Sequence, residues 1–113
     1  MSKYHSKPVE CDGIKFDSIT EYRRYLDLKL MERNGEISGL TVHPRYELQP
    51  AFKYNGKTER AITYTPDFEY ITPDGWKVVE DVKSTPTKTE AYSIRRRLLI
   101  RQYPEVKFME VEA

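Results

Sequence analysis

The pattern of hydrophobic and polar residues in the first third of the chain predicts a short hairpin followed by a helix. The hairpin is expected over residues 9–16, because Asp12-Gly13 is a dipeptide typical of a two-residue turn. The helix is expected to begin at Ser18, since Ser18-Ile19-Thr20-Glu21 has the pattern of a capping box. It is expected to end near Asn34, where Gly35 suits a left-handed stop.

The middle of the chain has the shorter period of β-strands. Residues 37–52 alternate imperfectly and contain Pro44 and Pro50, which favours an edge strand or a bent strand. Asn55-Gly56 marks a turn, and the next strand is expected over residues 61–71.

The last third predicts a strand, a helix and a final strand. The first strand is expected over residues 76–83. Thr87-Lys88-Thr89-Glu90 is a second capping box, which predicts a helix running to about Tyr103. Pro104 follows as a stop signal, and residues 106–111 are expected to form a short strand. The order of helix, strands, helix and strand predicts a mixed α/β domain.

The connection between the strands at 61–71 and 76–83 predicts which side chains face one another. Thr72-Pro73-Asp74-Gly75 favours a three-residue hairpin loop with the glycine in the left-handed region. In that register Asp67 lies opposite Asp81, and Lys83 follows two residues along on the same face. A two-residue loop would place Asp67 opposite Glu80 instead. The opposite face is expected to be core and carries Phe68, Tyr70, Val78 and Val82. Glu80 also points to this face, and its role stays open.

Glu21 lies within the hydrophobic arc of the first helix. This arc is wide and comprises Ile19, Tyr22, Tyr25, Leu26, Leu28 and Leu30. An acid on the inward side of a helix needs a partner. The capping box explains Glu21 as well as a role in binding a cation does, so both interpretations remain open.

Length and composition favour one compact domain. The chain has 113 residues, of which 12% are aromatic, too many for a disordered chain. A single domain is expected over residues 9–113, preceded by a flexible basic arm over residues 1–8. Cys11 is the one cysteine, which excludes an internal disulfide and a cysteine-based zinc site. The sequence contains neither a long apolar run nor a secretory signal, so a cytoplasmic location away from membranes is expected.

Charge is distributed unevenly, although the net charge is only +1. Residues 66–82 contain five acids and one base, a local charge of −4. Residues 83–103 contain six bases and one acid, a local charge of +5. Clustered carboxylates hold hard cations, and neighbouring bases hold phosphates. The alternative is two solvated faces of opposite sign.

Taken together, Glu21, Pro66-Asp67 and Asp81-Val82-Lys83 resemble the signature of the restriction-endonuclease-like PD-(D/E)xK nuclease superfamily. The fold this implies is an α/β core of helix, three mainly antiparallel strands, helix and strand. The segments around Asp67 and Asp81 are also similar to a family of small phage-encoded proteins assigned to this superfamily. A more distant similarity is to archaeal Holliday-junction resolvases.

The resemblance implies a role for each of these residues. Asp67 and Asp81 would bind a metal ion, the Val82 carbonyl would join them, and Glu21 would complete the site directly or through water. Lys83 would orient or help deprotonate the attacking water and stabilise the charged phosphate. Because the ligands are oxygens, the implied cofactor is Mg²⁺ or Mn²⁺ rather than zinc.

The second helix offers candidate contacts to DNA. Arg95 and Arg96 lie off its apolar stripe, and Lys88 lies near its start. All three are expected either to hold the phosphate backbone or to form a solvated face. Tyr92 is expected to pack rather than to stack on a base. His43 has no second histidine or cysteine at ligand spacing, so it is interpreted as a structural or surface residue.

The expected function is a Mg²⁺-dependent DNA endonuclease that hydrolyses phosphodiester bonds. Branched or recombining DNA is the expected substrate, with Holliday-junction resolution as a specific case. One active site per chain implies a homodimer for cutting both strands. A phage-encoded protein would act in the host cytoplasm. The alternatives are a nucleic-acid-binding module of the same fold without catalysis, and a protein–protein adaptor with an acidic patch.

Overall fold

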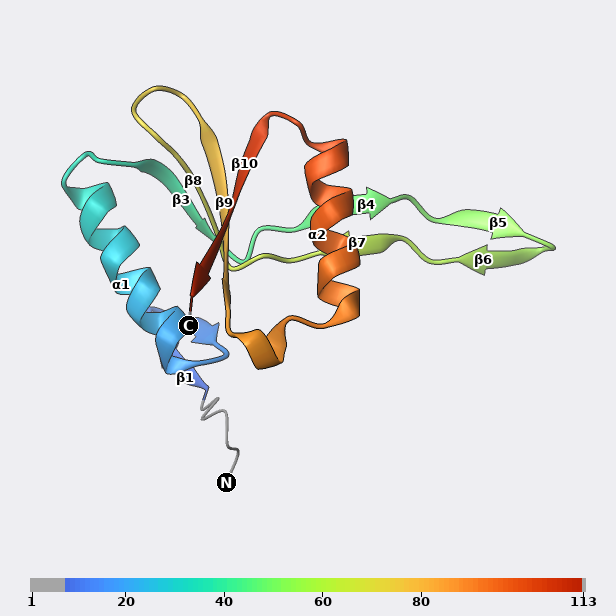
Figure 1. Ribbon diagram of the computed structural model, residues 1–113, viewed down its shortest axis with the longest axis horizontal. Helices are drawn as coiled ribbons and strands as arrows, with labels where there is room; N and C mark the ends of the chain where they lie inside the picture. Colours follow the sequence, from blue (N-terminus) through green and yellow to red (C-terminus); the bar gives the residue numbers. More distant parts are fainter. Residues whose placement is uncertain (1–7, 113) are drawn as a thin grey trace.

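A four-stranded sheet with one helix on each side forms the body of the protein. The computed structural model describes residues 8–112, and Figure 1 shows the arrangement of their helices and strands. The strand order in the sheet is β10-β9-β8-β3. Its members are β3 (Ser38–Val42), β8 (Phe68–Ile71), β9 (Lys77–Lys83) and β10 (Val106–Glu112). The expected mixed α/β class is confirmed.

The register of β8 and β9 is the one that the loop sequence predicts. Phe68 pairs with Glu80, and Ile71 pairs with Lys77. The loop between them is closed by a hydrogen bond from the Thr72 N–H to the Trp76 carbonyl at 2.9 Å. Gly75 has a φ of 89°, which a residue with a side chain rarely adopts. On the sheet's edges, β3 runs antiparallel to β8 and β10 runs parallel to β9.

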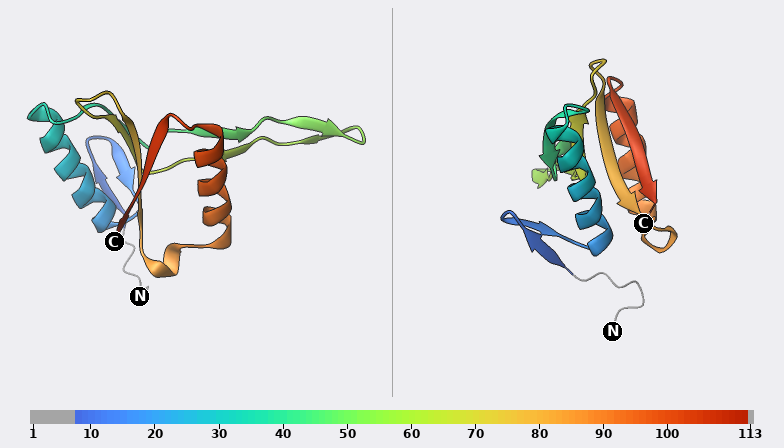
Figure 2. Two further views of the ribbon diagram at one scale, coloured as in Figure 1. Left: turned by 45° about the horizontal axis from the view of Figure 1, so that its top comes forward. Right: turned by 90° about the vertical axis from the view of Figure 1, so that its left-hand side faces the viewer.

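The two helices cover opposite faces of this sheet (Figure 2). Helix α1 (Ile19–Arg33) packs on one face and α2 (Glu90–Gln102) on the other. The core under α1 comprises Phe16, Tyr25, Leu28, Ile37, Phe68, Tyr70 and Val78. The core under α2 comprises Tyr46, Leu48, Tyr64, Val79, Tyr92 and Leu99. Because strand residues alternate, consecutive residues of β9 contribute to different cores.

Local turn and cap signals account for most element boundaries. Strands β1 (Val9–Cys11) and β2 (Ile14–Phe16) form the expected hairpin, with Asp12 at a φ of 55° and Gly13 at 75°. The Ser18 hydroxyl accepts from the Glu21 N–H at 3.1 Å, so the first N-cap is confirmed. Gly35, with a φ of 76°, follows the end of α1 as expected.

The second helix begins two residues later than its capping-box pattern predicts. Its N-cap is Thr89, whose hydroxyl accepts from the Tyr92 N–H at 3.1 Å. Thr87 instead ends the short 3-10 helix η1 (Thr85–Thr87). There the Thr87 hydroxyl accepts from the Ser84 N–H at 2.9 Å and donates to the Ser84 carbonyl at 2.8 Å. Thr87 is therefore already engaged in a local turn and does not cap α2.

Two predicted strands are each divided in the structure. The segment at 37–52 divides into β3, β4 (Tyr46–Gln49) and β5 (Phe52–Tyr54). The segment at 61–71 divides into β7 (Ile62–Tyr64) and β8. The breaks contain Pro44, Pro50 and Pro66, which lack the N–H that a continuous ladder needs. At these points the chain leaves the main sheet for the pairs β4–β7 and β5–β6 (Lys57–Glu59).

The hydrophobic arc predicted for α1 is wider than the face it buries. Glu21, Tyr25 and Leu28 are the buried residues of this helix. Ile19, Leu26 and Leu30 are about half exposed, on the side away from the core. Hydrophobic residues therefore occur on both faces of α1, and the sequence pattern alone does not separate them.

Two further expectations concern the ends of the chain and membranes. Apart from Pro8, the flexible arm predicted over residues 1–8 lies outside the described residues. Within residues 8–112, no helix combines the length and the apolar character that crossing a membrane requires.

Glu80, whose role the sequence leaves open, forms a buried ion pair between the sheet and α1. Its carboxylate is fully buried and accepts from Arg24 Nε at 2.8 Å and from Arg24 Nη2 at 2.7 Å. The Tyr70 hydroxyl also donates to this carboxylate. The hydrogen bond with Glu80 raises the pKa of Arg24. Glu80 therefore holds α1 against β9 and is not a replacement for Asp81.

We expect Glu80→Gln to destabilise the fold by about 3–5 kcal/mol, because it leaves the Arg24 guanidinium without its charged partner. Urea unfolding followed by circular dichroism measures this loss. Arg24→Met and Glu80→Leu, combined with Tyr70→Phe to remove the hydroxyl that binds Glu80, should recover most of it, because apolar residues of similar size need no partner. Glu36→Gln, at an exposed loop position, is the control. An unchanged unfolding midpoint in Glu80→Gln would contradict the structural role of this pair.

Candidate metal centre

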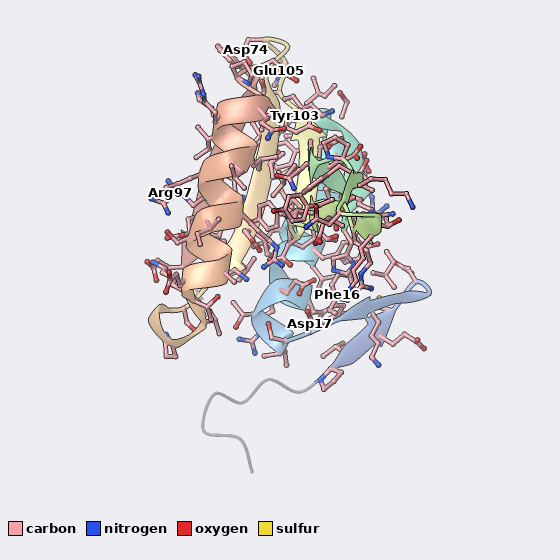
Figure 3. The ribbon with its side chains drawn as sticks, turned by 90° about the vertical axis from the view of Figure 1, so that its right-hand side faces the viewer. Phe16, Asp17, Asp74, Arg97, Tyr103 and Glu105 are labelled. Atoms are coloured by element: carbon pink, nitrogen blue, oxygen red, sulfur yellow. The ribbon has the colours of Figure 1, made fainter. Side chains whose placement is uncertain are left out.

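Asp67 and Asp81 come together at the end of the β8–β9 hairpin away from its loop. Asp67 precedes β8, and its N–H donates at 3.1 Å to the carbonyl of Glu80, the residue that pairs with Phe68, so the regular pairing with β9 shifts by one residue at Asp67. Asp81 lies in β9 and is buried. Figure 3 shows Asp17, which lines the same cleft as Asp67, at the opposite end of the molecule from Asp74 and Glu105. The hydrogen bond between the Asp67 and Asp81 carboxyl groups places these two residues side by side, although the regular β8–β9 pairing ends at Phe68 and Glu80.

The environment of Asp67 disfavours its negative charge. Burial is the largest cause of its raised pKa, followed by the hydrogen bond and repulsion from Asp81 and then by repulsion from Glu21. The Val82 N–H donates to Asp67 Oδ2 at 2.6 Å and partly offsets these effects. In the absence of a cation, Asp67 therefore holds a proton over a wider pH range than an ordinary aspartate does.

Asp81 is held from the α2 side of the sheet. The Tyr64 hydroxyl donates to Asp81 Oδ2, and Lys83 Nζ lies 3.8 Å from Asp81 Oδ1. Burial, followed by the nearby Asp81 charge, raises the pKa of Tyr64, so its hydroxyl stays protonated and acts as a donor. Lys83 Nζ also lies 4.8 Å from the centre of the Tyr92 ring. These contacts fix the direction of both Asp81 and Lys83.

Glu21 fulfils a structural role and also belongs to the site. Its N–H is bound by the Ser18 hydroxyl, and its Oε2 accepts from the Asp17 N–H at 3.3 Å. Its Oε1 lies 2.7 Å from His43 Nε2. The Glu21 side chain is buried, so its carboxylate oxygens face the interior of the protein and can accept further bonds only there. A structural role for Glu21 at the start of α1 and a role in binding a cation, which the sequence left open, are therefore compatible with each other.

His43 is the residue that sequence reasoning did not include. It follows β3 with a φ of 54°, and its N–H donates to the Asp67 carbonyl at 2.9 Å. This turn aims the ring at Glu21, and one ligand atom each from Glu21, His43 and Asp67 lies within 4.8 Å of the other two. The partners come from α1 and from the residue before β8, so no local spacing in the sequence indicates the group.

The acidic residues line a small cleft of about 160 Å³. Its lining residues are Asp17, Ser18, Glu21, Asp67, Val82, Lys83 and Thr87. Four of the predicted site residues thus share one cleft, and Asp81 joins them through its contact with Asp67. A larger cavity of about 610 Å³ lies between the β1–β2 hairpin, α1 and β3, with His43 in its wall.

The donor atoms suit a divalent cation. Two carboxylates and an imidazole converge, and the raised pKa of Asp67 is the expected property of an acid that lacks a compensating charge. Carboxylate oxygens accept Mg²⁺ or Mn²⁺, whereas a transition metal accepts an imidazole ligand more readily than Mg²⁺ does. The residues present therefore fit a metal, and His43 shifts the preference toward Mn²⁺.

The predicted DNA-contacting residues already have partners within the protein. Lys88 Nζ lies 2.8 Å from Glu110 and 3.7 Å from Glu112. Arg95 Nε donates to the Thr63 carbonyl at 3.3 Å, and the Arg96 guanidinium lies 5.3 Å from the Phe108 ring centre. Among the α2 bases, Arg97 projects away from the sheet (Figure 3).

Tyr92, by contrast, behaves as expected. It is buried, and its hydroxyl donates to Glu110 at 2.6 Å, so the expectation that it packs is confirmed.

We expect Asp67→Asn to make the metal-free protein more stable, because an amide can donate to Asp81 while still accepting from the Val82 N–H. Removing repulsion between opposite carboxylates is worth up to about 1 kcal/mol, which corresponds to roughly 4 °C in melting temperature for a domain of this size. Thermal unfolding in EDTA measures the difference. Mn²⁺ should raise the melting temperature of the wild type and leave that of Asp67→Asn nearly unchanged.

The raised pKa of Asp67 predicts the direction in which the stability of the metal-free protein changes with pH. A raised pKa means that the folded metal-free state holds a proton that the unfolded chain releases above about pH 4. Metal-free stability should therefore fall as pH rises through the neutral range, and Asp67→Asn should lack this part of the slope. Asp27→Asn, at an exposed position on α1, is the matched control. A less stable Asp67→Asn in EDTA would show that Asp67 is satisfied without a cation.

Comparison with known proteins identifies one family. No curated protein and no solved structure matches the chain. One family model, described as "Protein of unknown function (DUF1064)", matches residues 1–112, nearly the whole sequence. The chain therefore belongs to the DUF1064 family.

Proposed function

We propose that this protein is a metal-dependent DNA endonuclease that hydrolyses phosphodiester bonds. The observation that carries the proposal is the convergence of Glu21, Asp67, Val82 and Lys83 on one cleft, with Asp81 in contact with Asp67. These residues come from α1, the segment before β8, and β9. Acids that can hold a divalent cation supply the main requirement of metal-assisted phosphodiester hydrolysis, and a neighbouring lysine adds positive charge for the phosphate.

The order of elements supports the same proposal. In chain order, α1, β3, β8, β9, α2 and β10 follow the pattern of helix, three strands, helix and strand. The β3, β8 and β9 strands are antiparallel neighbours, and β10 is parallel to β9. This is the core expected for the PD-(D/E)xK nucleases that the sequence resembles. Because a fold hosts many functions, the side chains in the cleft carry more weight than the topology.

Each side chain has a distinct task in this proposal. Asp67, Asp81 and Glu21 would hold the cation, with His43 and the Val82 carbonyl as further ligands. The cation, Mg²⁺ or Mn²⁺, would supply Lewis-acid chemistry to the phosphodiester. Tyr64 fixes the Asp81 carboxylate through its hydroxyl. Lys83, beside Asp81, would orient the attacking water and balance the charge that develops on the phosphate.

The proposed DNA contacts of α2 differ in the existing interactions that each side chain would lose on binding DNA. Lys88 would have to leave Glu110 and Glu112, whereas Arg95 gives up one hydrogen bond to a carbonyl. Arg95 is therefore the stronger phosphate contact of the two, because among the described residues it has no ion pair to break. Arg96 would act while stacked on Phe108. Branched DNA remains the proposed substrate, and a homodimer the proposed assembly for cutting both strands.

A nucleic-acid-binding module without catalysis is the second candidate. Its supporting observation is that Glu21 pairs with His43, while Asp81 is bound by Tyr64 and Lys83. A site without turnover can keep such contacts for stability alone. Binding that persists in EDTA, together with no cutting in Mn²⁺, would favour this candidate.

Cleavage assays test the proposal directly. Wild-type protein should cut labelled DNA with Mg²⁺ or Mn²⁺ and not with EDTA, on a four-way junction or on a matched linear duplex. We expect Asp81→Asn and Lys83→Met each to lower the cleavage rate by roughly 10²–10⁴-fold, the usual effect of losing a group that acts on the reacting atoms. Glu47→Gln, exposed on β4, is the control. A folded wild type that cuts none of the linear, nicked and branched substrates would overturn the proposal.

His43 provides a separate test of the metal centre. We expect His43→Asp to weaken Mn²⁺ binding relative to Mg²⁺, because it replaces an imidazole by a hard oxygen donor. Isothermal titration with each metal measures the ratio of the two affinities without any substrate. An unchanged ratio would place His43 outside the coordination sphere.

A further inference from the structure

A long β-ribbon (residues 49–62) projects from the body of the protein (Figure 1). Gln49 pairs with Ile62, and farther out Phe52 pairs with Glu59 and Tyr54 with Lys57, all in one continuous register. Pro50, which has no N–H, explains the gap between the two paired stretches. Asn55-Gly56 closes the tip, with φ values of 51° and 77°.

The ribbon buries almost nothing against the rest of the protein. Every residue from 49 to 60 is exposed. Two of these exposed residues are aromatic and belong to neither core: Phe52 is 47% exposed and Tyr54 is 63% exposed. An isolated two-stranded hairpin is only marginally stable in water, and exposed aromatic residues gathered on one element mark an interaction site. The ribbon therefore has the properties of a binding element.

Its charge indicates the kind of partner. Lys53, Lys57 and Arg60 outnumber the single acid, Glu59. Within residues 8–112, the three bases form no ion pair. Alternation along the strands places Lys57 on the same face as Phe52 and Tyr54, and Lys53 and Arg60 on the other. Cations thus lie on both faces of a narrow ribbon, which suits a groove with a phosphate backbone on each side.

The base of the ribbon is firmly connected to the candidate metal centre. Strand β7 ends at Tyr64, whose hydroxyl binds Asp81, and three residues later the chain reaches Asp67. Arg95 of α2 donates to the Thr63 carbonyl of the same strand. An apolar groove of about 220 Å³, lined by Ile62, Ala91, Ile94, Arg95 and Leu98, lies where the ribbon meets α2. A partner held by the ribbon is therefore positioned relative to the cleft.

We propose that the ribbon is a docking element that enters a groove of duplex nucleic acid beside the candidate metal centre. A two-stranded ribbon fits the major groove, which is about 12 Å wide. Lys53, Lys57 and Arg60 contact phosphates, and Phe52 and Tyr54 pack on sugars and base edges. This inference rests on the proposed function only for cleavage of the bound duplex. Binding of the duplex by the ribbon needs no metal.

The test measures binding to a fluorescently labelled duplex in EDTA over a series of salt concentrations. The first variant is Lys53→Gln/Lys57→Gln/Arg60→Gln. Its matched control is Lys15→Gln/Lys29→Gln/Arg33→Gln, which removes the same number and kinds of exposed base elsewhere. We expect the ribbon variant to weaken binding at least about tenfold and to flatten the salt dependence by about 0.9 per lost phosphate contact. The control should stay within about twofold of wild type, because its three basic residues lie on β2 and α1, outside the ribbon.

A shortened ribbon tests the element as a whole. Removing residues 52–54 and 57–59 leaves Ala51 and Arg60 joined through Asn55-Gly56 in the same register. Because the deleted residues are exposed, the melting temperature should not change while binding falls. Tyr54→Ala should weaken binding without changing the salt slope.

The outcomes separate the two proposals. The docking role is overturned if the ribbon variants bind the duplex as tightly as the wild type does. It is also overturned if the wild type binds no duplex, and the ribbon would then be assigned to a protein partner. A ribbon-dependent complex that is never cut supports docking and counts against the nuclease. Cutting that survives ribbon removal with unchanged affinity for the duplex supports the nuclease and overturns docking.

Discussion

The pairing of β8 with β9 is the constraint on which the candidate site depends. Its three-residue loop, with Gly75 in the left-handed region, sets the register that pairs Phe68 with Glu80 and so brings the next residues, Asp67 and Asp81, together. A slip by one residue would exchange the faces of Glu80 and Asp81 and would place a different acid beside Asp67. The buried pair of Arg24 with Glu80 opposes such a slip, because it fixes Glu80 on the α1 side. Local turn chemistry and a long-range ion pair therefore favour the same arrangement.

Two adjacent acids in β9 illustrate how environment separates structure from function. Glu80 is completely buried, but a guanidinium and a hydroxyl satisfy its charge. On the other face, Asp81 faces Tyr64 and Lys83 and repels Asp67, whose pKa is raised. The first acid stabilises the fold, whereas the second contributes to a group with unbalanced negative charge. Such imbalance is characteristic of sites that act on a ligand.

The site and the ribbon are mechanically parts of one unit. Strand β7 carries the ribbon at one end and, through Tyr64, contacts Asp81 at the other. Helix α2 packs over β7 and supplies Arg95 to its backbone. The ribbon is therefore connected to the sheet through packed side chains and not through a free loop. This arrangement gives a small domain a long reach while its acidic cleft stays compact.

The sequence by itself determined the features that depend on local interactions. The N-cap at Ser18, the left-handed glycines at 35 and 75, the turns at 12–13 and 55–56 and the β8–β9 register all follow from neighbouring residues. Tertiary structure decided what local interactions leave open. It decided which sheet each part of the two divided strands joins, because a strand's partner lies far away in the chain. It also paired Glu80 with Arg24 and brought His43 to Glu21 and Asp67, since these contacts join residues far apart in the chain.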